Sequence, residues 1–205
     1  MAGMVKKKKK IKEKTFMIVG DPNCGKTSLI EVMECNVNPE LPTVYFKFIS
    51  AEKTRPKYRK KTKKVLLSLW DTPAENWHET REAIYPHLDS AIIVFAIDDP
   101  ASLRNVKDKW YPQLRQLCPK KIPVILVGNK TDTRDNPQPA VNTVSYEEGM
   151  ATAEEIKAYA YVECSALNKN GTLNVFTFAI QSVIKKSRWY RRTSSSILEG
   201  ISVEE

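Results

Sequence analysis

Gly20-Asp21-Pro22-Asn23-Cys24-Gly25-Lys26-Thr27 is the stretch that decides the fold. It fits the pattern G-x-x-x-x-G-K-[ST], between a short apolar run at 16–19 and a segment at 28–33 with helical apolar spacing. A strand, a glycine-rich loop and a helix in this order are the context that a phosphate-binding loop requires. Glycines let backbone N–H groups converge on phosphate oxygens at the positive end of the helix. The flanking elements favour this interpretation over a chance glycine turn.

Two side chains of this stretch have a predicted chemical role. Lys26 is expected to neutralise the terminal phosphates of a bound nucleotide, and the Thr27 hydroxyl is expected to bind Mg²⁺. The stretch therefore predicts a nucleotide-binding protein.

Length and cysteine usage narrow the class of protein. The 205 residues suit one α/β domain with tails, which is long enough to bury a core. The four cysteines lie without C-x-x-C spacing, so they predict neither a zinc site nor a disulfide framework, and they indicate a reducing, intracellular location. The lysine run at the N-terminus is not followed by an apolar segment, and no window approaches ~18 apolar residues. We expect a cytoplasmic protein that is neither secreted nor membrane-spanning.

The charge is distributed unevenly along the chain. The net charge is +9, and 20 of the 33 basic residues lie in three stretches, at 6–14, 53–64 and 185–192. The rest of the chain is acidic, with 13 basic against 23 acidic residues. Basic stretches of this kind suit anionic lipid surfaces or nucleic acid. They equally suit solvated tails and an exposed loop that keep the protein soluble.

The alternation of apolar runs and helical patterns predicts an α/β fold. Together with the phosphate-binding loop, this alternation predicts a three-layer P-loop NTPase fold, with an about six-stranded, mostly parallel sheet and helices on both faces. Residues 45–50 and 65–70 are expected to pair as an antiparallel hairpin, and residues 35–44 to form a mobile loop. The expected organisation is a basic, disordered extension at 1–13, a nucleotide-binding domain at 14–187 and a flexible tail at 188–205. The remaining expected strands are 91–97, 124–128 and 161–164, and the remaining expected helices are 74–85, 102–117, 145–158 and 172–186.

Three further motifs lie at the carboxyl ends of predicted strands, where open α/β sheets bind ligands. Asp71 in Asp-Thr-Pro can hold Mg²⁺ through water, residues 129–132 read N-K-x-D, and residues 164–167 read Cys-Ser-Ala-Leu. The Asp132 carboxylate can accept from both N1–H and the 2-amino group of guanine, a pattern that adenine does not offer. The ordered set of four motifs predicts selection of GTP over ATP.

The chain resembles the Ras-like small GTPases, and within them the Rho/Rac family, over roughly residues 15–186. The residues that carry this resemblance are Cys-Gly-Lys-Thr (24–27), Leu-Pro-Thr-Val (41–44), Leu-Trp-Asp-Thr (69–72), Tyr-Pro (85–86), Lys-Trp-Tyr-Pro (109–112), Cys-Pro (118–119) and Glu-Cys-Ser-Ala-Leu (163–167). The resemblance implies GTP or GDP with Mg²⁺ as the ligands. It implies that Thr27, Thr43 and Asp71 hold the metal, and that the nucleotide is held by Asn23, Cys24, Gly25, Lys26, Thr27, Ser28, Thr43, Ala74, Asn129, Lys130, Asp132, Ser165, Ala166 and Leu167.

The resemblance also implies a switch. Switch I is expected around residues 41–48 and switch II at 74–85, with effector proteins and guanine-nucleotide exchange factors as partners and a monomeric chain. In this family, γ-phosphate contacts order both loops and hydrolysis releases them. Lys26, Thr43 and Glu75 occupy the positions expected to act in hydrolysis.

Departures from the family pattern fall on the switches. The family writes D-T-A-G-Q in switch II, whereas this chain has Asp71-Thr72-Pro73-Ala74-Glu75. The family glutamine orients the attacking water, so Glu75 either serves as a general base or is repelled by the phosphates. Pro22 replaces a glycine of the phosphate loop, where it either obstructs an activating protein's arginine finger or suits a tight turn. Without an aromatic between Thr27 and Leu41 to stack on guanine, nucleotide release is expected to be fast.

Two further departures concern the surface of the protein. Residues 133–145 are too short, with Pro137 and Pro139, for the full Rho insert helix. The chain ends in Ile-Ser-Val-Glu-Glu without a C-a-a-X box, so prenylation is not expected. Membrane contact would then depend on the basic stretches, reversibly and with salt sensitivity.

These observations leave three functions open. The first is a GTP-hydrolysing signalling switch of cytoskeletal or membrane-traffic type, and the second is a hydrolysis-deficient, constitutively GTP-bound binding module. The third and most remote is nucleic-acid binding by the basic stretches, which no aromatic-rich platform accompanies. Turnover of bound GTP distinguishes the first two.

Overall fold

The protein is built on one seven-stranded sheet, seen in a computed structural model that describes residues 12–32, 36–37, 44–53, 61–71, 84–135 and 142–184. The strand order is β2-β3-β4-β1-β5-β6-β7. Strands β4, β1, β5, β6 and β7 are parallel, and β2 and β3 add an antiparallel edge. The strands span β1 (Lys12–Val19), β2 (Asn36–Val37), β3 (Val44–Lys53), β4 (Lys61–Asp71), β5 (Ser90–Ala96), β6 (Val124–Asn129) and β7 (Ala160–Glu163).

Helices connect the parallel strands, and local sequence signals mark where several of them begin. Asp99 precedes α3 and accepts a hydrogen bond from the Ala101 amide at 3.0 Å, while Ser145 and Glu148 form a capping box at α6. The described helical elements are α1 (Lys26–Glu31), η1 (Tyr85–His87), α3 (Pro100–Asn105), the π-helical turn η2 (Val106–Trp110), α4 (Tyr111–Leu117), α5 (Asp132–Asp135), α6 (Tyr146–Glu155) and α7 (Thr172–Ile184).

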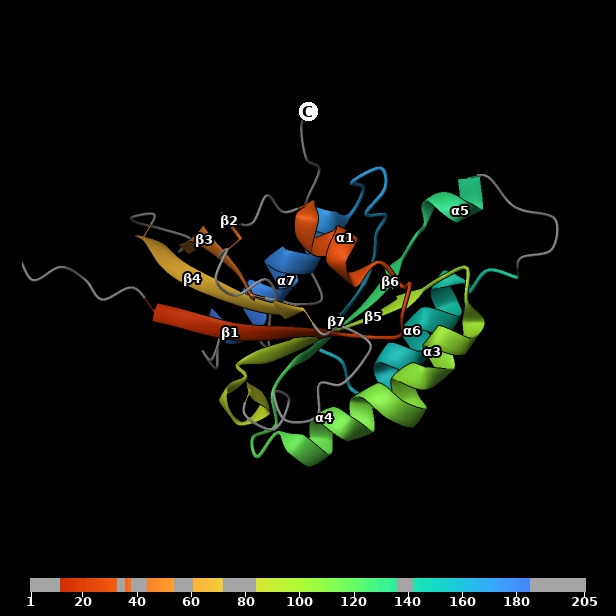
Figure 1. Cartoon of the computed structure of the whole chain (residues 1–205), viewed down its shortest axis with the longest axis horizontal. Coiled ribbons are helices and arrows are strands. Elements are labelled where there is room, and N and C mark those ends of the chain that lie inside the picture. Colours follow the sequence, from red (N-terminus) through yellow and green to blue (C-terminus); the bar gives the residue numbers. More distant parts are fainter. Residues whose placement is uncertain are drawn as a thin grey trace, which may run out of the picture.

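Alternate strand residues face two separate hydrophobic cores, which produces the three layers visible in Figure 1. On one face, Phe16, Ile18 and their neighbours pack against α1 and α7. On the other face, Met17, Val19 and their neighbours pack against η1, η2, α4 and α6. The central strands β5 and β6 are buried along their whole length, as expected for parallel strands covered on both sides.

The predicted three-layer α/β architecture is confirmed, and so is the antiparallel β3–β4 hairpin, which pairs Tyr45 with Leu69 and Lys53 with Lys61. Two predictions about where strands form were wrong. Asn36–Val37 forms a seventh strand inside the stretch expected to be a loop, because it can pair its backbone with the edge strand β3. Strand β1 starts at Lys12, inside the segment expected to be disordered, because β4 extends far enough to pair with it.

The carboxyl ends of the five parallel strands meet at one edge of the sheet. Gly20 follows β1, Asp71 ends β4, Asn129 ends β6 and Cys164 follows β7. All four predicted nucleotide-binding motifs therefore start from this edge. Within the ranges that the structure describes, no helix has the length and apolar character needed to cross a membrane.

Candidate functional site

The loop between β1 and α1 requires glycine at two positions. Gly20 has φ +152°, and a Cβ there would lie 2.1 Å from the Val94 carbonyl oxygen. Gly25 has φ +81°, and a Cβ there would lie 2.4 Å from Asn129 Nδ2. The two glycines thus let the loop pack directly against β5 and β6.

Lys26 lies back across this loop. Its side chain is 8% exposed, and its Nζ donates to the carbonyl oxygens of Gly20 at 3.1 Å and Asp21 at 2.8 Å. These acceptors are neutral, so they hold the ammonium group in place without cancelling its charge. A buried cation at the mouth of a glycine-rich loop favours binding of an anion.

The Asp21 carboxylate is held away from the loop interior by two donors from the helical segment beside it. Asn105 Nδ2 donates to Asp21 Oδ2 at 2.6 Å, and Trp110 Nε1 donates to Oδ1 at 2.8 Å. Trp110 is the last residue of the π-helical turn η2, and such turns are frequent at functional sites. Trp110 is 4% exposed, and nothing in the sequence around it predicts this bond to the phosphate loop.

Replacing Trp110 with Phe tests the contribution of this bond. The ring would remain in the core, but Asp21 would lose one of its two donors, so we expect unfolding free energy to fall by about 1.5 kcal/mol. Urea denaturation followed by circular dichroism measures this loss. Lys109→Met is the control, because it removes the cation 4.5 Å from the same indole ring and leaves the Asp21 bond intact. Equal stability of Trp110→Phe and wild type would contradict the assignment.

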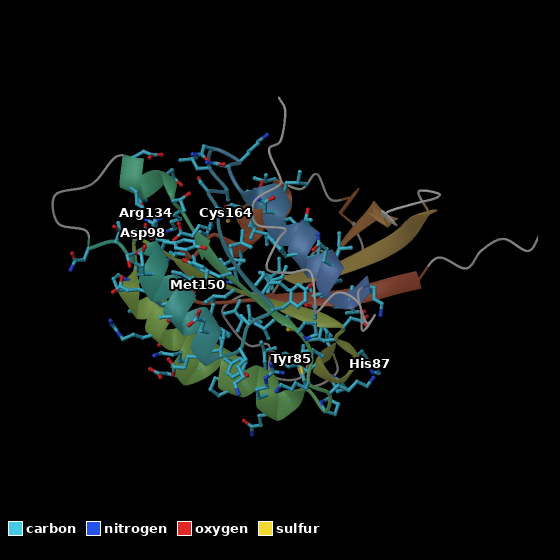
Figure 2. All side chains as sticks on the ribbon, turned by 180° about the vertical axis from the view of Figure 1, so that it is seen from behind. Tyr85, His87, Asp98, Arg134, Met150 and Cys164 are labelled. Carbon is cyan, nitrogen blue, oxygen red and sulfur yellow. The ribbon has the colours of Figure 1, made fainter. Side chains whose placement is uncertain are left out.

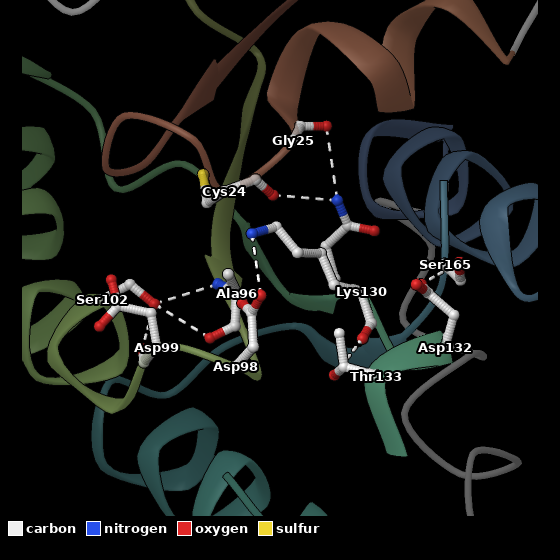
Figure 3. A network of polar contacts seen from close by, with 11 residues as sticks. Cys24, Gly25, Ala96, Asp98, Asp99, Ser102, Lys130, Asp132, Thr133 and Ser165 are labelled. Atoms are coloured by element: carbon white, nitrogen blue, oxygen red, sulfur yellow. Dashed lines mark hydrogen bonds and ion pairs between the residues drawn. The ribbon is translucent and has the colours of Figure 1, made fainter. Parts of the chain in front are cut away.

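Asn129 joins two of the predicted motifs. Asn129 is only 1% exposed. Its Nδ2 donates to the carbonyl oxygens of Cys24 at 2.9 Å and Gly25 at 3.4 Å. Its Oδ1 accepts from the Ala166 amide at 3.0 Å. Figure 3 shows the Cys24 and Gly25 carbonyl groups that accept the two bonds to the phosphate loop. One amide therefore fixes the phosphate loop relative to the loop that follows β7.

The other residues of the N-K-x-D motif also have defined partners. Lys130 adopts φ +67°, and its Nζ forms an ion pair with Asp98 Oδ2 at 3.1 Å. The Ser165 hydroxyl donates to Asp132 Oδ1, and the Ser165 side chain is fully buried. Figure 3 shows both contacts at the same edge of the sheet. Asp98 was not among the predicted residues, and only its position just beyond β5 could have indicated it.

Cys24 is a packing residue of the phosphate loop. It is 1% exposed, and its Sγ would lie 3.0 Å from a Cβ at Gly20. Burial is the main cause that raises the pKa of the Cys24 thiol to about 11, and the nearby Lys26 only partly opposes this. The thiol therefore stays protonated at neutral pH, which argues against redox sensing at this position.

Alkylation measures this protonation state. With a pKa of about 11, only about one Cys24 thiol in a thousand is ionised at pH 8, and this fraction rises about tenfold per pH unit. We expect iodoacetamide to label the Cys24 peptide slowly in folded protein, with a rate that climbs steadily to pH 10. The same peptide in urea should react rapidly with a midpoint near the ordinary thiol pKa. Rapid labelling of native protein at pH 7 would contradict the buried, neutral thiol.

The structure brings together the described members of the predicted site. Asn23 has φ +62°, and Thr27 and Ser28 are exposed at the start of α1. Leu167, in the loop after β7, is 81% exposed. Asp71 is placed by its backbone at the end of β4, paired with Ile18. The remaining predicted positions, Thr43, Ala74 and Glu75, lie outside the described residues.

The fold and the loops at this edge are those of the P-loop small GTPase class. The Ras family model matches residues 15–185. The chain is 38% identical over 195 residues to GTP-binding protein rhoC of Emericella nidulans, covering 89% of this chain and 68% of the relative. It is 37% identical over 195 residues to GTP-binding protein rho4 of Schizosaccharomyces pombe, covering 90% and 93%. The chain belongs to the Ras family and is a Rho-like small GTPase, a family whose members are GTP hydrolases in general.

Proposed function

We propose that this chain is a guanine-nucleotide-dependent signalling switch that binds GTP or GDP with Mg²⁺ at the carboxyl edge of the sheet. The observation that carries the proposal is the Asn129 side chain, which bonds both the phosphate loop and Ala166. This link holds the phosphate loop, the N-K-x-D loop and the 165–167 loop in a fixed arrangement, which suits one ligand that contacts all three. A nucleotide with a purine base has that length and chemistry.

The donors at the site fit the nucleotide and its metal. Asn23 to Ser28 would surround the phosphates, and the buried Lys26 ammonium would offset their charge. The Thr27 hydroxyl and the carboxylate of Asp71 are hard oxygen ligands of the kind Mg²⁺ prefers, and Thr43 would add a third. Bound Mg²⁺ would neutralise charge on the phosphate oxygens.

We propose slow hydrolysis and fast exchange for this switch. Glu75 stands where the family has a neutral glutamine, and no aromatic residue lies between Thr27 and Leu41 to stack on the base. The alternative is a constitutively GTP-bound binding module without useful turnover. Effectors would bind at 41–48 and 74–85, exchange factors would catalyse release, and residues 14–187 would form the monomeric GTPase domain. Signalling to the actin cytoskeleton is the pathway that the Rho relationship favours.

Competition for a fluorescent nucleotide tests the proposal. The full chain is loaded with a methylanthraniloyl derivative of GDP in Mg²⁺ and then mixed with excess GTP, GDP or ATP. We expect GTP and GDP to displace the probe completely, and ATP to require a concentration at least about 1,000-fold higher. Equal displacement by ATP would overturn guanine selectivity. No loading of the probe would overturn nucleotide binding itself.

We further propose that the chain contacts an anionic membrane surface at the opposite edge of the sheet. The register pairs Lys53 with Lys61 and Ala51 with Lys63, which places three lysines at the end of the hairpin. Helix α7 ends near the same edge, where the Ser182 hydroxyl donates to Ser90 Oγ at 3.1 Å, and the basic stretch 185–192 follows it in the sequence. The nucleotide and both switches would then face away from the lipid.

Vesicle co-sedimentation measures this contact. Each basic residue contributes about 1 kcal/mol near an anionic leaflet, so reversing Lys53, Lys61 and Lys63 to Glu should weaken binding to phosphatidylserine vesicles about 100-fold. The matched control reverses the exposed cations Arg104, Lys109 and Lys169, which lie in α3, in η2 and in the loop after β7. Equal losses in both triple variants would contradict a specific face. Stronger binding to RNA than to vesicles at the same salt would favour the nucleic-acid alternative.

A further inference from the structure

A bidentate ion pair between Arg134 and Glu163 lies next to the loops that carry the guanine-binding motifs. Arg134 in α5 follows Asp132 by two residues, and Glu163 ends β7 immediately before Cys164. Arg134 Nη1 lies 2.5 Å from Glu163 Oε2, and Nη2 lies 2.8 Å from Oε1. In Figure 2, Arg134 lies close to Asp98 and Cys164 in the upper part of the molecule, whereas Tyr85 and His87 lie in the lower part.

Further bonds hold both partners of this pair. Arg134 Nη2 also donates to the Val144 carbonyl at 2.6 Å, and the Tyr161 hydroxyl donates to Glu163 Oε1 at 2.8 Å. Tyr161 can lie there because residue 149 is glycine, whose absent Cβ would fall 2.0 Å from the tyrosine oxygen. The side chains of Arg134 and Glu163 are 32% and 15% exposed. The pair is therefore largely shielded and fixed in orientation, unlike a mobile surface ion pair.

The neighbouring contacts show what the ion pair holds together. The Ser165 hydroxyl donates to Asp132, and the Thr131 amide donates to the Cys164 carbonyl at 3.2 Å. These contacts join the 129–132 loop to the 164–167 loop, which are the two loops proposed to hold the base. The Arg134–Glu163 ion pair also joins these two segments. Arg134 is two residues after Asp132, and Glu163 is one residue before Cys164.

We infer that the Arg134–Glu163 pair is a positioning clamp, which sets the distance between the Asp132 carboxylate and the Ala166 amide and thereby slows guanine-nucleotide release. This inference rests on the proposed guanine-nucleotide binding. Neither side chain needs to touch the base, because a shift in the spacing of the two loops would lengthen the hydrogen bonds that the Asp132 carboxylate and the Ala166 amide make to the guanine. Sequence reasoning missed both residues, since neither belongs to a nucleotide-binding motif.

The chain contains a matched pair for comparison. Lys107 and Glu155 form an ion pair at 2.9 Å between η2 and α6, but their side chains are 39% and 62% exposed and touch neither base-binding loop. Removing this pair changes the same types of charge without affecting the spacing of the loops. The double variant Lys107→Met/Glu155→Gln therefore controls for general electrostatic and stability effects.

Stopped-flow release of fluorescent GDP and IDP from the full chain tests the clamp. We expect Arg134→Met to speed GDP release about tenfold, a typical size for coupling between distinct groups. IDP lacks the 2-amino group and makes one bond fewer to Asp132, so its release should accelerate by only about threefold. Arg134→Lys should fall between, because an ammonium cannot form the bidentate pair. Glu163→Gln keeps an acceptor for the Tyr161 hydroxyl and should also speed GDP release. If Arg134→Met does not fold, Glu163→Gln replaces it in the test.

The outcomes separate this inference from the proposed function. If wild type binds GDP, and Arg134→Met and Glu163→Gln lower the unfolding temperature but release GDP at the wild-type rate, the pair is only structural and the clamp is overturned. Equal acceleration of GDP and IDP, or equal acceleration in the Lys107/Glu155 control, would overturn it as well. If wild type binds no GDP, the proposed function fails before the clamp is tested.

Discussion

Asp132→Asn should weaken GDP binding by about 100- to 1,000-fold, because two hydrogen bonds from guanine to a carboxylate are lost. The loss should be specific to the base and not to folding. The Ser165 hydroxyl donates to Asp132 Oδ1, and an asparagine oxygen can still accept that bond. Its amide nitrogen would then face the base in place of a carboxylate oxygen. An N–H donor there matches the C2 carbonyl of xanthine, so XDP should bind the variant better than GDP.

Competition titrations of wild type and variant with GDP and XDP measure this exchange of specificity. Asp135→Asn is the matched control, since Asp135 lies exposed at the end of the same short helix α5 and should leave both affinities unchanged. Unchanged GDP affinity in Asp132→Asn would show that the carboxylate does not read the base.

Glu75→Gln should speed hydrolysis of bound GTP by about tenfold or more, within the range of a correctly placed acid–base or water-orienting group. In this family a glutamine at position 75 supplies a neutral amide that orients the attacking water, and the substitution also removes the negative charge of Glu75. The measurement is a single-turnover assay in which the protein is loaded with γ-labelled GTP and Mg²⁺ and release of label is followed.

Glu75→Ala separates the two causes in that assay. It removes the charge but cannot orient water, so acceleration by Gln alone indicates positioning, whereas acceleration by both indicates relief of repulsion. Slower release from Glu75→Gln than from wild type would mean that Glu75 acts as a general base, and the proposed slow turnover would be wrong.

The architecture was predictable because short motifs and apolar periodicity both act locally. Local sequence determines the conformation of several segments of the site: the glycines at 20 and 25, the buried strand at 124–128 and the turn at 164–167. Parallel strand pairing then brings these segments to one edge of the sheet. The failures lie at an edge strand, β2, and at the amino end of a central strand, β1. Asn36–Val37 and Lys12 join strands only because a neighbouring backbone offers unpaired groups, and a single segment does not reveal its neighbour.

The contacts that orient the site were less predictable. Asp21 is held by Asn105 and Trp110, which are 84 and 89 residues away in the chain. Arg134 and Glu163 are separated by 29 residues and carry no motif of their own. Such pairings depend on how helices pack over the sheet and on a π-helical turn, and neither follows from local propensity. The motifs thus indicate the ligand, and the tertiary structure shows which side chains hold the motifs in place.

The most direct test is the nucleotide that the full chain carries when it is isolated rapidly in Mg²⁺-containing buffer. Native mass spectrometry gives the stoichiometry, and chromatography of the released nucleotide gives its identity. We expect one guanine nucleotide per chain, with GTP in excess of GDP because exchange is fast and hydrolysis slow. A chain that carries GDP alone would contradict slow hydrolysis. A chain that carries an adenine nucleotide, or none even after incubation with GTP and Mg²⁺, would contradict the assignment of a guanine-nucleotide switch.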